Sequence, residues 1–488
     1  MTVMIYNTLN NRKEEFSPRS PGKVDMYVCG PTTYNLIHLG NARPLIVFDT
    51  VRRYFEYSGF KVTFVQNFTD IDDKIINRAG EEGADPLALA AKYIKEYYKD
   101  AGALGVRPAT IHPKVSEHLA EIIEMIRGIL NNGYAYVVDG DVYFSVSKFT
   151  GYGRLSGRKL EDMQAGARID VDERKQHPMD FALWKAAKPG EPAWDSPWGQ
   201  GRPGWHIECS AMAAKYLGMG FDIHGGGFDL IFPHHENEIA QAEACTGCGP
   251  FARYWMHNGF ITVNEEKMSK SLGNFFTVRE ILAKYDPEVI RFYMLSTHYR
   301  SPLDFDDTKL DMNKKSLTRL HNALDNIEAM LDSVAFGESN VSLEAPTADL
   351  NRAIVKAEDD FRAAMDDDFN TALAIASLFD LARETNSFGK AVTEYAGKPV
   401  PVYVKDALEQ ARAVVYRLGE VLGLFERRGP AGQDESGMVE KLMGLLIEIR
   451  QEARAKKDWA VADAIRNKLG EIGIILEDTP QGIRWKKK

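Results

Sequence analysis

Short, mainly apolar runs alternate with segments of helical apolar spacing through about the first 110 residues. Val24–Cys29 is such a run, and it ends in Gly30-Pro31, which predicts a buried strand followed by a turn. Lys61–Asn67 predicts a second strand, and Pro86–Leu104 has the apolar spacing of a helix. Strands that alternate with helices predict a parallel sheet.

A further helix is predicted between these two strands. After the segment His38–Pro44, apolar residues recur at helical spacing up to Ser58-Gly59. We expect Pro44 to lie in the first turn of this helix, where the missing N–H of proline costs little.

The alternation loosens between about His112 and Pro203 and resumes at Trp205. The interrupted region contains a helix-like segment, a strand-like segment and a stretch rich in Gly, Pro and Trp: His118–Asn131, Tyr134–Val146 and Lys188–Gly204. Beyond it the pattern predicts a helix, a strand and a helix near Ile207–Leu217, Phe221–His224 and His234–Cys245. We therefore expect one doubly wound α/β domain split by an insertion, with its ligand site at the carboxyl ends of the strands.

After about Leu310 the chain becomes helical, with Leu, Ala and Ile at 3.6-residue spacing. Arg427–Gly437 is rich in Gly and polar residues, and it predicts a linker. A small basic module closes the chain.

Composition adds limits to this picture. The chain has 488 residues, of which 44% are apolar and 27% charged, so two to four domains with real cores are expected. No stretch approaches the roughly 18 uncharged apolar residues of a membrane span, and the N-terminus lacks the apolar run of a signal peptide. We expect a cytoplasmic protein without a membrane partner. Its four cysteines are too few for a disulfide scaffold, which leaves buried apolar residues, metal ligands or reactive thiols.

The charge is unevenly distributed. The net charge of −10 argues against a nucleic-acid partner, because phosphate binding needs basic surface. Met438–Lys488, however, contains 11 Lys and Arg against 8 Asp and Glu, so the rest of the chain carries −13. The last residues, Arg484–Lys488, combine basic charge with a tryptophan. This tail is either a nucleic-acid contact or a frayed, solvated end.

Two segments have the residue types of a phosphate site. Lys267-Met268-Ser269-Lys270-Ser271 precedes a glycine, and its lysines suit charge that develops on a leaving pyrophosphate. His38-Leu39-Gly40-Asn41 stands at a predicted helix start, where free backbone N–H groups bind anions. Taken alone, the first segment is better explained as a solvated surface loop and the second as an ordinary capped helix start.

A third group has the residue types of a metal site. His234 and Glu238 stand one helical turn apart on one face. In a doubly wound sheet, Cys29 and Cys209 would meet them at the carboxyl edge, and two thiolates, an imidazole and a carboxylate suit zinc. The competing pair is Cys245-x-x-Cys248, which lacks the second pair of a zinc ribbon. A polar helix face is the alternative for the histidine and glutamate.

Together these segments resemble the class I aminoacyl-tRNA synthetases, and within that class the cysteinyl-tRNA synthetases. The class has two signature segments, usually written HIGH and KMSKS, which stand here as HLGN (His38–Asn41) and KMSKS (Lys267–Ser271). The second matches in full. In the first, Leu39 changes packing, and Asn41 keeps a donor but lacks the ionisable ring of histidine.

The likeness to the cysteinyl family extends from the first strand almost to the C-terminus. Its further segments are Cys29–Thr32, Phe68–Lys74, Gly204–Cys209, His224–Gly227, Pro233–Glu238, Met365–Asn370 and Ile475–Gly482.

The resemblance implies an architecture. It is an α/β fold with a Rossmann-type doubly wound parallel sheet and a connective insertion, followed by an α-helical bundle and a small C-terminal domain. We expect the catalytic halves over 1–111 and 204–309, the second with the KMSKS loop, and the insertion over 112–203. A helical tRNA-binding bundle would span 310–427 and an anticodon-recognition domain 438–488.

The resemblance also implies a reaction and its cofactors. Cysteine is activated with ATP to cysteinyl-adenylate and then transferred to the 3′-terminal ribose of tRNA(Cys). One zinc ion per chain would be held by Cys29, Cys209, His234 and Glu238 and would select the substrate thiolate over serine, so that no editing domain is needed. Mg²⁺ would accompany ATP, and we expect a monomer.

Roles follow for individual residues. His38, Gly40 and Asn41 would hold the triphosphate, and Lys267 and Lys270 would neutralise the pyrophosphate. Trp205 would form a wall of the amino-acid pocket, and Thr69 and Asp229 would contact the backbone of the cysteine substrate. For each of these three residues, ordinary packing or capping is the alternative.

Two other functions remain open from the sequence. A related ligase joins cysteine to an amino sugar in mycothiol synthesis and should lack a full anticodon module. A non-catalytic zinc- and RNA-binding relative of a synthetase should not need intact signature segments.

Overall fold

The computed structural model describes residues 2–159, 173–263, 266–267, 276–426, 433–456, 458–471, 473–479 and 482–487. The chain divides into two compact units, Met1–Leu424 and Phe425–Lys488. None of the helices in these ranges combines the length and apolar character required to cross a membrane.

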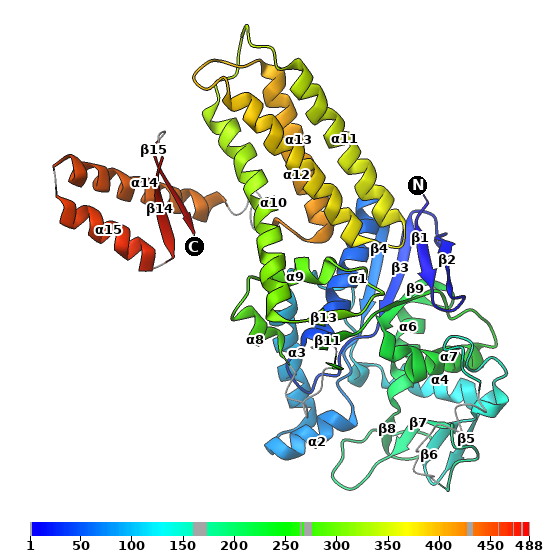
Figure 1. The fold of residues 1–488 in the computed structure, drawn as a ribbon. Helices are drawn as coiled ribbons and strands as arrows, with labels where there is room; N and C mark the ends of the chain where they lie inside the picture. Colours follow the sequence, from blue (N-terminus) through cyan, green and yellow to red (C-terminus); the bar gives the residue numbers. More distant parts are fainter. Residues whose placement is uncertain are drawn as a thin grey trace. The chain divides into compact units, whose positions relative to one another are not determined.

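A four-stranded parallel sheet forms the centre of the first unit (Figure 1). Its strands lie in the order β10 (Ala252–Asn258), β9 (Phe221–Gly227), β3 (Lys23–Val28) and β4 (Lys61–Gln66). The chain passes from β3 to β4 on one side and later returns to β9 and β10 on the other. The predicted doubly wound parallel sheet is therefore confirmed, with its strand order reversing between β3 and β9.

Helices connect and cover these strands. They are α1 (Leu39–Tyr57), α2 (Asp73–Glu82), α3 (Pro86–Ala103), α4 (Leu119–Asn131), α6 (Trp205–Leu217) and α7 (Glu236–Thr246). All but α2 were expected from apolar spacing. Helix α2 buries only two side chains, Ile75 and Ala79, so its apolar pattern is short, and its start is marked chiefly by the Asp72 side chain that caps it.

The expectation that Pro44 lies in the first turn of α1 is wrong. The helix begins at Leu39, because His38 has extended backbone and the Asn41 side chain accepts a hydrogen bond from His38 N–H at 3.2 Å. Pro44 consequently lies in the second turn, where it cannot donate to the carbonyl of Gly40.

The insertion forms an antiparallel sheet in the order β5 (Ala135–Val138), β6 (Asp141–Phe144), β7 (Phe181–Ala186) and β8 (Gly201–Pro203). The strand-like segment Tyr134–Val146 is a hairpin, since Asp139 and Gly140 both have positive φ (52° and 86°) and form its turn. The insertion is not a separate body: Phe144 and Trp184 belong to the same buried cluster as Tyr27 of β3.

A second small sheet follows β10. It consists of β11 (Ile261–Val263), β12 (Glu266–Lys267) and β13 (Leu303–Phe305), with α8 (Val278–Leu282) and α9 (Pro287–Leu295) between β12 and β13. A hairpin of β1 (Met4–Asn7) and β2 (Arg12–Glu15) opens the chain. The predicted helical bundle contains α10 (Asp307–Ser333), α11 (Glu344–Asp366), α12 (Thr371–Thr393) and α13 (Val402–Leu422).

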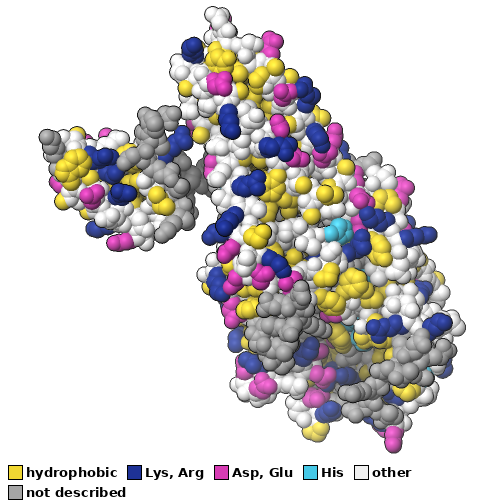
Figure 2. Space-filling model, in the orientation of Figure 1, with side chains coloured by type: hydrophobic (Ala, Val, Ile, Leu, Met, Phe, Trp, Pro, Cys, Tyr) yellow, Lys and Arg dark blue, Asp and Glu magenta, His cyan; other side chains and the backbone are white. Residues whose placement is uncertain are grey.

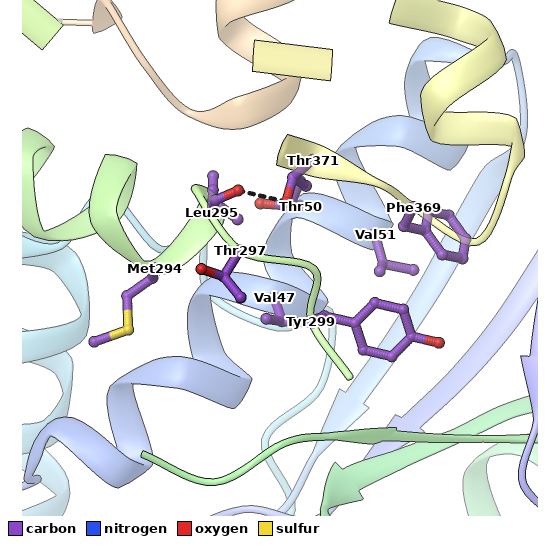
Figure 3. Close-up of a pocket in the computed structure, with 9 residues that line it drawn as sticks. All are labelled: Val47, Thr50, Val51, Met294, Leu295, Thr297, Tyr299, Phe369 and Thr371. Atoms are coloured by element: carbon purple, nitrogen blue, oxygen red, sulfur yellow. Dashed lines mark hydrogen bonds between the residues drawn. The ribbon is translucent and has the colours of Figure 1, made fainter. Parts of the chain in front are cut away.

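The turn between α11 and α12, residues 367–370, forms hydrogen bonds with segments of the sheet domain. The buried Asp368 carboxylate accepts hydrogen bonds from Tyr6 N–H, the Tyr299 hydroxyl and Arg300 Nε, each at 2.8 Å. Asp368 and Phe369 have φ of 64° and 52°, a conformation that these contacts hold in place. Beside them, Val47 of α1, Met294 of α9 and Thr371 of α12 line a small, mainly apolar gap of about 10 Å³ (Figure 3).

The second unit contains α14 (Gln433–Ala455), α15 (Trp459–Glu471) and a hairpin of β14 (Ile474–Thr479) and β15 (Gly482–Lys487). Helix α14 begins inside the linker expected over 427–437, so the end of that segment is helical; 427–432 lie outside the described residues. The basic tail is not frayed over Arg484–Lys487, because Trp485 pairs with Leu476 in the hairpin.

Gly30 lies in a crowded position just after the end of β3. A Cβ atom at this residue would lie 1.6 Å from the carbonyl oxygen of Asn67 and 2.8 Å from its carbon, so the backbone itself would have to move. We expect Gly30→Ala to lower the free energy of unfolding of the first unit by about 1–3 kcal/mol, measured by chemical denaturation. Gly102→Ala in α3, where a Cβ meets nothing within 4 Å, should be neutral or stabilising by up to about 1 kcal/mol. Equal losses in the two variants would contradict this account.

Candidate functional site

A cavity of about 340 Å³ opens where the strand order reverses. Its walls come from the end of β3, the start of α1, and the ends of β9 and β10. This is the crevice outside the carboxyl ends of the strands in which doubly wound sheets bind ligands. Its lining includes Cys29, His38, Gly40, Asn41, Trp205 and Asp229.

The HLGN segment forms one end of the cavity. His38, Gly40 and Asn41 all line it, at the N-terminus of a 19-residue helix whose first N–H groups and dipole favour anions. The Asn41 oxygen caps His38 N–H, which leaves the Asn41 NH₂ group as the donor that can face a ligand.

The residues that flank the KMSKS segment are fixed beside HLGN. Leu39 N–H donates to Phe276 O at 3.1 Å, and Val278 N–H donates to Ile37 O at 3.0 Å. On the other flank, the backbone of Lys267 is part of β12, which pairs with β11. Lys270 lies outside the described residues, as does the side chain of Lys267. Backbone hydrogen bonds thus bring the residues that follow the second signature segment beside the first.

Cys29, on the lining of the cavity, belongs to a cluster of metal-ligand side chains whose other members are buried behind it. The ligand atoms of Cys29, Cys209, His234 and Glu238 lie within 4.8 Å of one another. Cys29 Sγ is 3.7 Å from Cys209 Sγ and 3.4 Å from Glu238 Oε1. His234 Nε2 is 3.1 Å from Glu238 Oε1, as the spacing of one helical turn predicts, although His234 lies in the turn before α7.

A second set shares two of these ligands. Cys29 and Glu238 also lie within 4.8 Å of His224 and His235. A histidine that binds metal through one ring nitrogen carries its proton on the other, which then needs an acceptor. His234 has such a partner, since its Nδ1 lies 2.8 Å from Nδ1 of His206.

His224 lacks a comparable partner. Its buried Nδ1 has no hydrogen-bond partner in the described part of the chain, whereas its Nε2 lies 2.8 Å from Glu238 Oε2. As an Nε2–H donor, His224 orients the Glu238 carboxylate; as a metal ligand, it would bury an unsatisfied N–H. The set with Cys209 and His234 is therefore the better satisfied.

A chain of hydrogen bonds behind the cluster reaches Cys29. Thr8 Oγ1 lies 2.8 Å from His257 Nδ1, His257 Nε2 lies 2.8 Å from His235 Nδ1, and His235 Nε2 lies 3.4 Å from Cys29 Sγ. Burial lowers the pKa of His235 well below its ordinary value and that of His257 to about 3, so both rings are neutral. Neutral rings can donate in one direction along this chain, ending with an N–H on the Cys29 sulfur.

The electrostatics of the cluster favour a cation. Burial alone would raise the pKa of Glu238, but the imidazoles of His224 and His234 lower it to about 2. The hydrogen bond from Cys29 lowers the pKa of Cys209 to about 6 against the effect of burial. Burial opposes a charge on His234, yet Glu238 and Cys209 raise its pKa to about 10. The Glu238 carboxylate and the Cys209 thiolate thus face a protonated His234, while burial and the neighbouring Cys209 raise the pKa of Cys29 and keep it a thiol. A dication bound by all four ligands would displace both of these protons.

The three residues expected to contact the amino acid differ in position. Trp205 lines the cavity, is 41% exposed, and packs on His234 with ring centroids 4.5 Å apart. Asp229 also lines the cavity. Thr69 is buried, lies behind the lining, and its hydroxyl is 3.4 Å from the carboxylate of Glu208.

Residue-by-residue reasoning missed the histidines behind the cluster, His206, His224, His235 and His257. Their signal in the sequence was a concentration of histidines at predicted strand ends and helix starts. The alternative pair Cys245 and Cys248 belongs to neither metal-compatible group among the described residues. Cys248 is exposed beyond the end of α7, and Cys245 packs toward α4, since a Cβ at Gly128 would meet its sulfur at 2.6 Å.

Known families match most of the chain. A model described as the tRNA synthetases class I (C) catalytic domain matches residues 15–315, a DALR domain model matches 360–426, and a cysteinyl-tRNA ligase anticodon binding domain model matches 445–485. Mycobacterium tuberculosis methionyl-tRNA synthetase in complex with methionyl-adenylate has a similar structure, with a TM-score of 0.59 at 14% identity over 82% of this chain and 89% of that chain. At this identity the likeness shows the fold alone.

Curated relatives match from end to end. A protein of Pelotomaculum thermopropionicum called cysteine–tRNA ligase is 62% identical over 99% of both chains. A protein of the same name from Heliobacterium modesticaldum is 62% identical over 100% of both chains. Another, from Moorella thermoacetica, is 57% identical over 99% of this chain and 100% of its own. With these matches along its whole length, the chain belongs to the cysteinyl-tRNA synthetase family.

Proposed function

We propose that this chain is a cysteine–tRNA ligase: it activates cysteine with ATP to cysteinyl-adenylate and transfers cysteine to the 3′-terminal ribose of tRNA(Cys). The observation that carries the proposal is the two-ended cavity. On one side Cys29 connects the lining to the buried Cys₂–His–Glu cluster, whose sulfurs suit a thiol-binding metal, and on the other side the lining includes an anion-binding helix start. A thiol-bearing acid and a polyphosphate are the substrates that such a pair of ends accommodates.

The metal of the cluster is zinc in this proposal, held by Cys29, Cys209, His234 and Glu238. Two sulfurs, an imidazole and a carboxylate are a donor set that zinc accepts, and the partners of His234 and Glu238 satisfy the outer shell. Bound zinc would favour the thiolate of cysteine over the neutral hydroxyl of serine, which pocket shape alone discriminates only about 10- to 200-fold.

The protein's own side chains position the amino acid. Trp205 lines the cavity and packs on His234, where it would wall the amino-acid pocket. The Asp229 carboxylate lies on the lining, where it can pair with the α-ammonium group of cysteine. Thr69, which lies behind the lining, acts through backbone position: its carbonyl accepts hydrogen bonds from Thr33 N–H and the Thr33 hydroxyl, both at 3.1 Å.

Adenylate formation needs orientation and charge stabilisation more than covalent chemistry. His38, the Asn41 NH₂ group and the backbone at Gly40 hold the triphosphate so that the cysteine carboxylate faces the α-phosphorus. Lys267 and Lys270 neutralise the departing pyrophosphate. Mg²⁺ accompanies ATP as its counter-ion.

The parts beyond the cavity suit tRNA. Lys314, Lys315 and Arg319 are exposed on α10, and Lys and Arg side chains are spread along the bundle in Figure 2. The second unit carries the basic β15. A ligase for a small sugar would not need this unit, and a non-catalytic relative would not need the cavity. The proposed enzyme acts as a monomer, and we place its activity in the cytoplasm.

The metal assignment predicts that zinc and activity are lost together when Cys209 is replaced, but not when Cys245 is replaced. Cys209→Ser should remove the bound zinc and lower cysteine-dependent ATP–pyrophosphate exchange by at least about 100-fold, more than the loss expected for an outer-shell partner. Cys245→Ser is the matched control, since Cys245 lies outside both candidate sets, and it should keep the metal and the activity. Elemental analysis and the exchange assay on the same samples give both readouts. Zinc that stays with Cys209→Ser and leaves with Cys245→Ser would refute the site.

The division into two units predicts a separation of the two steps. A chain ending at Glu426 retains the first unit, so it should make cysteinyl-adenylate at close to the full rate. Its charging of tRNA at low tRNA concentration should fall by about tenfold or more, and the remaining affinity should depend less steeply on salt, because phosphate contacts are lost. Pyrophosphate exchange and tRNA charging measured on one preparation test this. Equal losses in both assays would mean that the second unit merely stabilises the first.

A further inference from the structure

Arg43, in the second turn of α1, is fully buried and donates to backbone carbonyls. Its Nη1 donates to Gly259 O at 2.9 Å and to Phe260 O at 2.8 Å. Its Nη2 donates to Ser301 O at 2.5 Å and lies 3.4 Å from His298 O. Within the described ranges no carboxylate forms an ion pair with it. This is an unusual use of a buried guanidinium, whose charge is ordinarily paired.

The carbonyls that Arg43 holds belong to the wall of the cavity. Gly259 and Phe260 connect β10 to β11, and both line the cavity. Strand β11 pairs with β12, whose last residue is Lys267. Arg43 itself follows Gly40 by three residues, so it lies on the same side of the helix start as part of the HLGN segment. One side chain therefore ties the helix of the first signature segment to the strand that leads into the second.

The backbone around these carbonyls is packed without space for adjustment. A Cβ atom at Gly259 would lie 2.6 Å from Ser301 O and 2.7 Å from Arg300 O. Gly259 N–H also donates to Tyr299 O at 2.9 Å. From its other side, the 298–301 segment is held by Asp368, which accepts hydrogen bonds from Tyr299 and Arg300. Arg43 thus sets the separation between α1 and a wall that is rigid behind it.

Arg43 also leaves a positive charge beside this end of the cavity. Burial lowers the pKa of Arg43 to about 10, which still keeps the guanidinium charged at neutral pH. The carbonyl dipoles solvate the charge but do not cancel it. Because a buried charge is weakly screened, it adds to the attraction of the α1 N-terminus for a polyanion.

We propose that Arg43 is a positioning residue for the nucleotide: by fixing the Gly259–Phe260 wall at a set distance from the His38–Asn41 helix start, it shapes the ATP end of the cavity and leaves the cysteine end unaffected. The inference rests on the proposed function, in which the nucleotide is ATP. The cysteine end is anchored by other residues, the cluster around Cys29 and Cys209, none of which contacts Arg43.

Arg53 provides a matched control on the same helix. It is 3% exposed, and it pairs with Asp49 at 2.8 Å and with the carbonyls of Glu420 and Gly105 at 3.0 and 2.9 Å. These partners do not line the cavity. Arg43→Met, Arg43→Lys, Arg53→Met and Arg53→Lys should be compared in the full-length, metal-loaded chain by melting temperature and by ATP–pyrophosphate exchange at varied ATP and cysteine.

Arg43→Met should raise the KM for ATP by about 10- to 100-fold, the loss of a charge-assisted hydrogen bond, while the KM for cysteine stays within about twofold. Arg43→Lys should recover part of the loss, because it restores the charge but not the paired donors. The Arg53 variants should lower the melting temperature without changing the KM for ATP. If Arg43→Met does not fold, Arg43→Lys tests the inference in the same way: its KM for ATP should rise while its KM for cysteine stays unchanged.

The inference is overturned if the KM values for ATP and cysteine rise together in the Arg43 variants, or if the Arg53 variants shift the KM for ATP equally. Absence of cysteine-dependent exchange in the wild-type chain would instead refute the proposed function. In that case calorimetric titration with a non-hydrolysable ATP analogue still tests Arg43: weaker binding by the Arg43 variants alone supports its role, and unchanged binding overturns it.

Discussion

Strands β3 and β9 lie side by side in the sheet although the connective insertion separates them in the sequence, and the chain leaves them in opposite directions. This reversal opens a crevice at the carboxyl edge, because no crossover helix covers it. Two glycines allow close packing beside this crevice. A Cβ at Gly30, after β3, would collide with the Asn67 backbone that follows β4, and one at Gly225 of β9 would lie 2.4 Å from the Phe48 ring of α1. The positions of Cys29, the α1 helix start and the cavity all depend on this close approach.

The two ends of the cavity use charge in different ways. At the cluster, the negative charges of Glu238 and Cys209 are only partly offset by the charge of His234, and the surrounding histidines contribute N–H groups rather than charge, since burial keeps His206, His235 and His257 neutral. Such a shell is complementary to a dication. At the opposite end the helix dipole and the unpaired Arg43 charge are complementary to phosphate. The distance between the ends would then determine which amino acid and nucleotide can be joined.

The sequence was sufficient for the features that depend on local pattern and topology. Apolar runs bounded by Gly and Pro located β3 and β4, and the alternation of strands with helices predicted where Cys29, Cys209, His234 and Glu238 would converge. It was insufficient where tertiary contacts override local preference. The start of α1 depends on a hydrogen bond between His38 and Asn41 that displaced Pro44 into the second turn. The positive φ of Asp368 depends on donors from segments far away in the sequence.

The supporting residues of the site could not be predicted for a similar reason. His235 bonds His257 and Cys29, and His224 bonds Glu238. The directions of these side chains are fixed only in the folded sheet. Arg43 lies within an ordinary helical pattern, and nothing in that pattern distinguishes it from Arg53. Its partners are backbone carbonyls, which carry no sequence signal.

The most direct test of the account concerns the sulfur ligands of the metal. Zinc K-edge X-ray absorption of the metal-loaded chain should show two sulfur ligands at about 2.3 Å without substrate and three after cysteine is added, with no change on addition of serine. A sulfur count that cysteine leaves unchanged would contradict the claim that the Cys29, Cys209, His234 and Glu238 cluster selects the substrate through its thiolate.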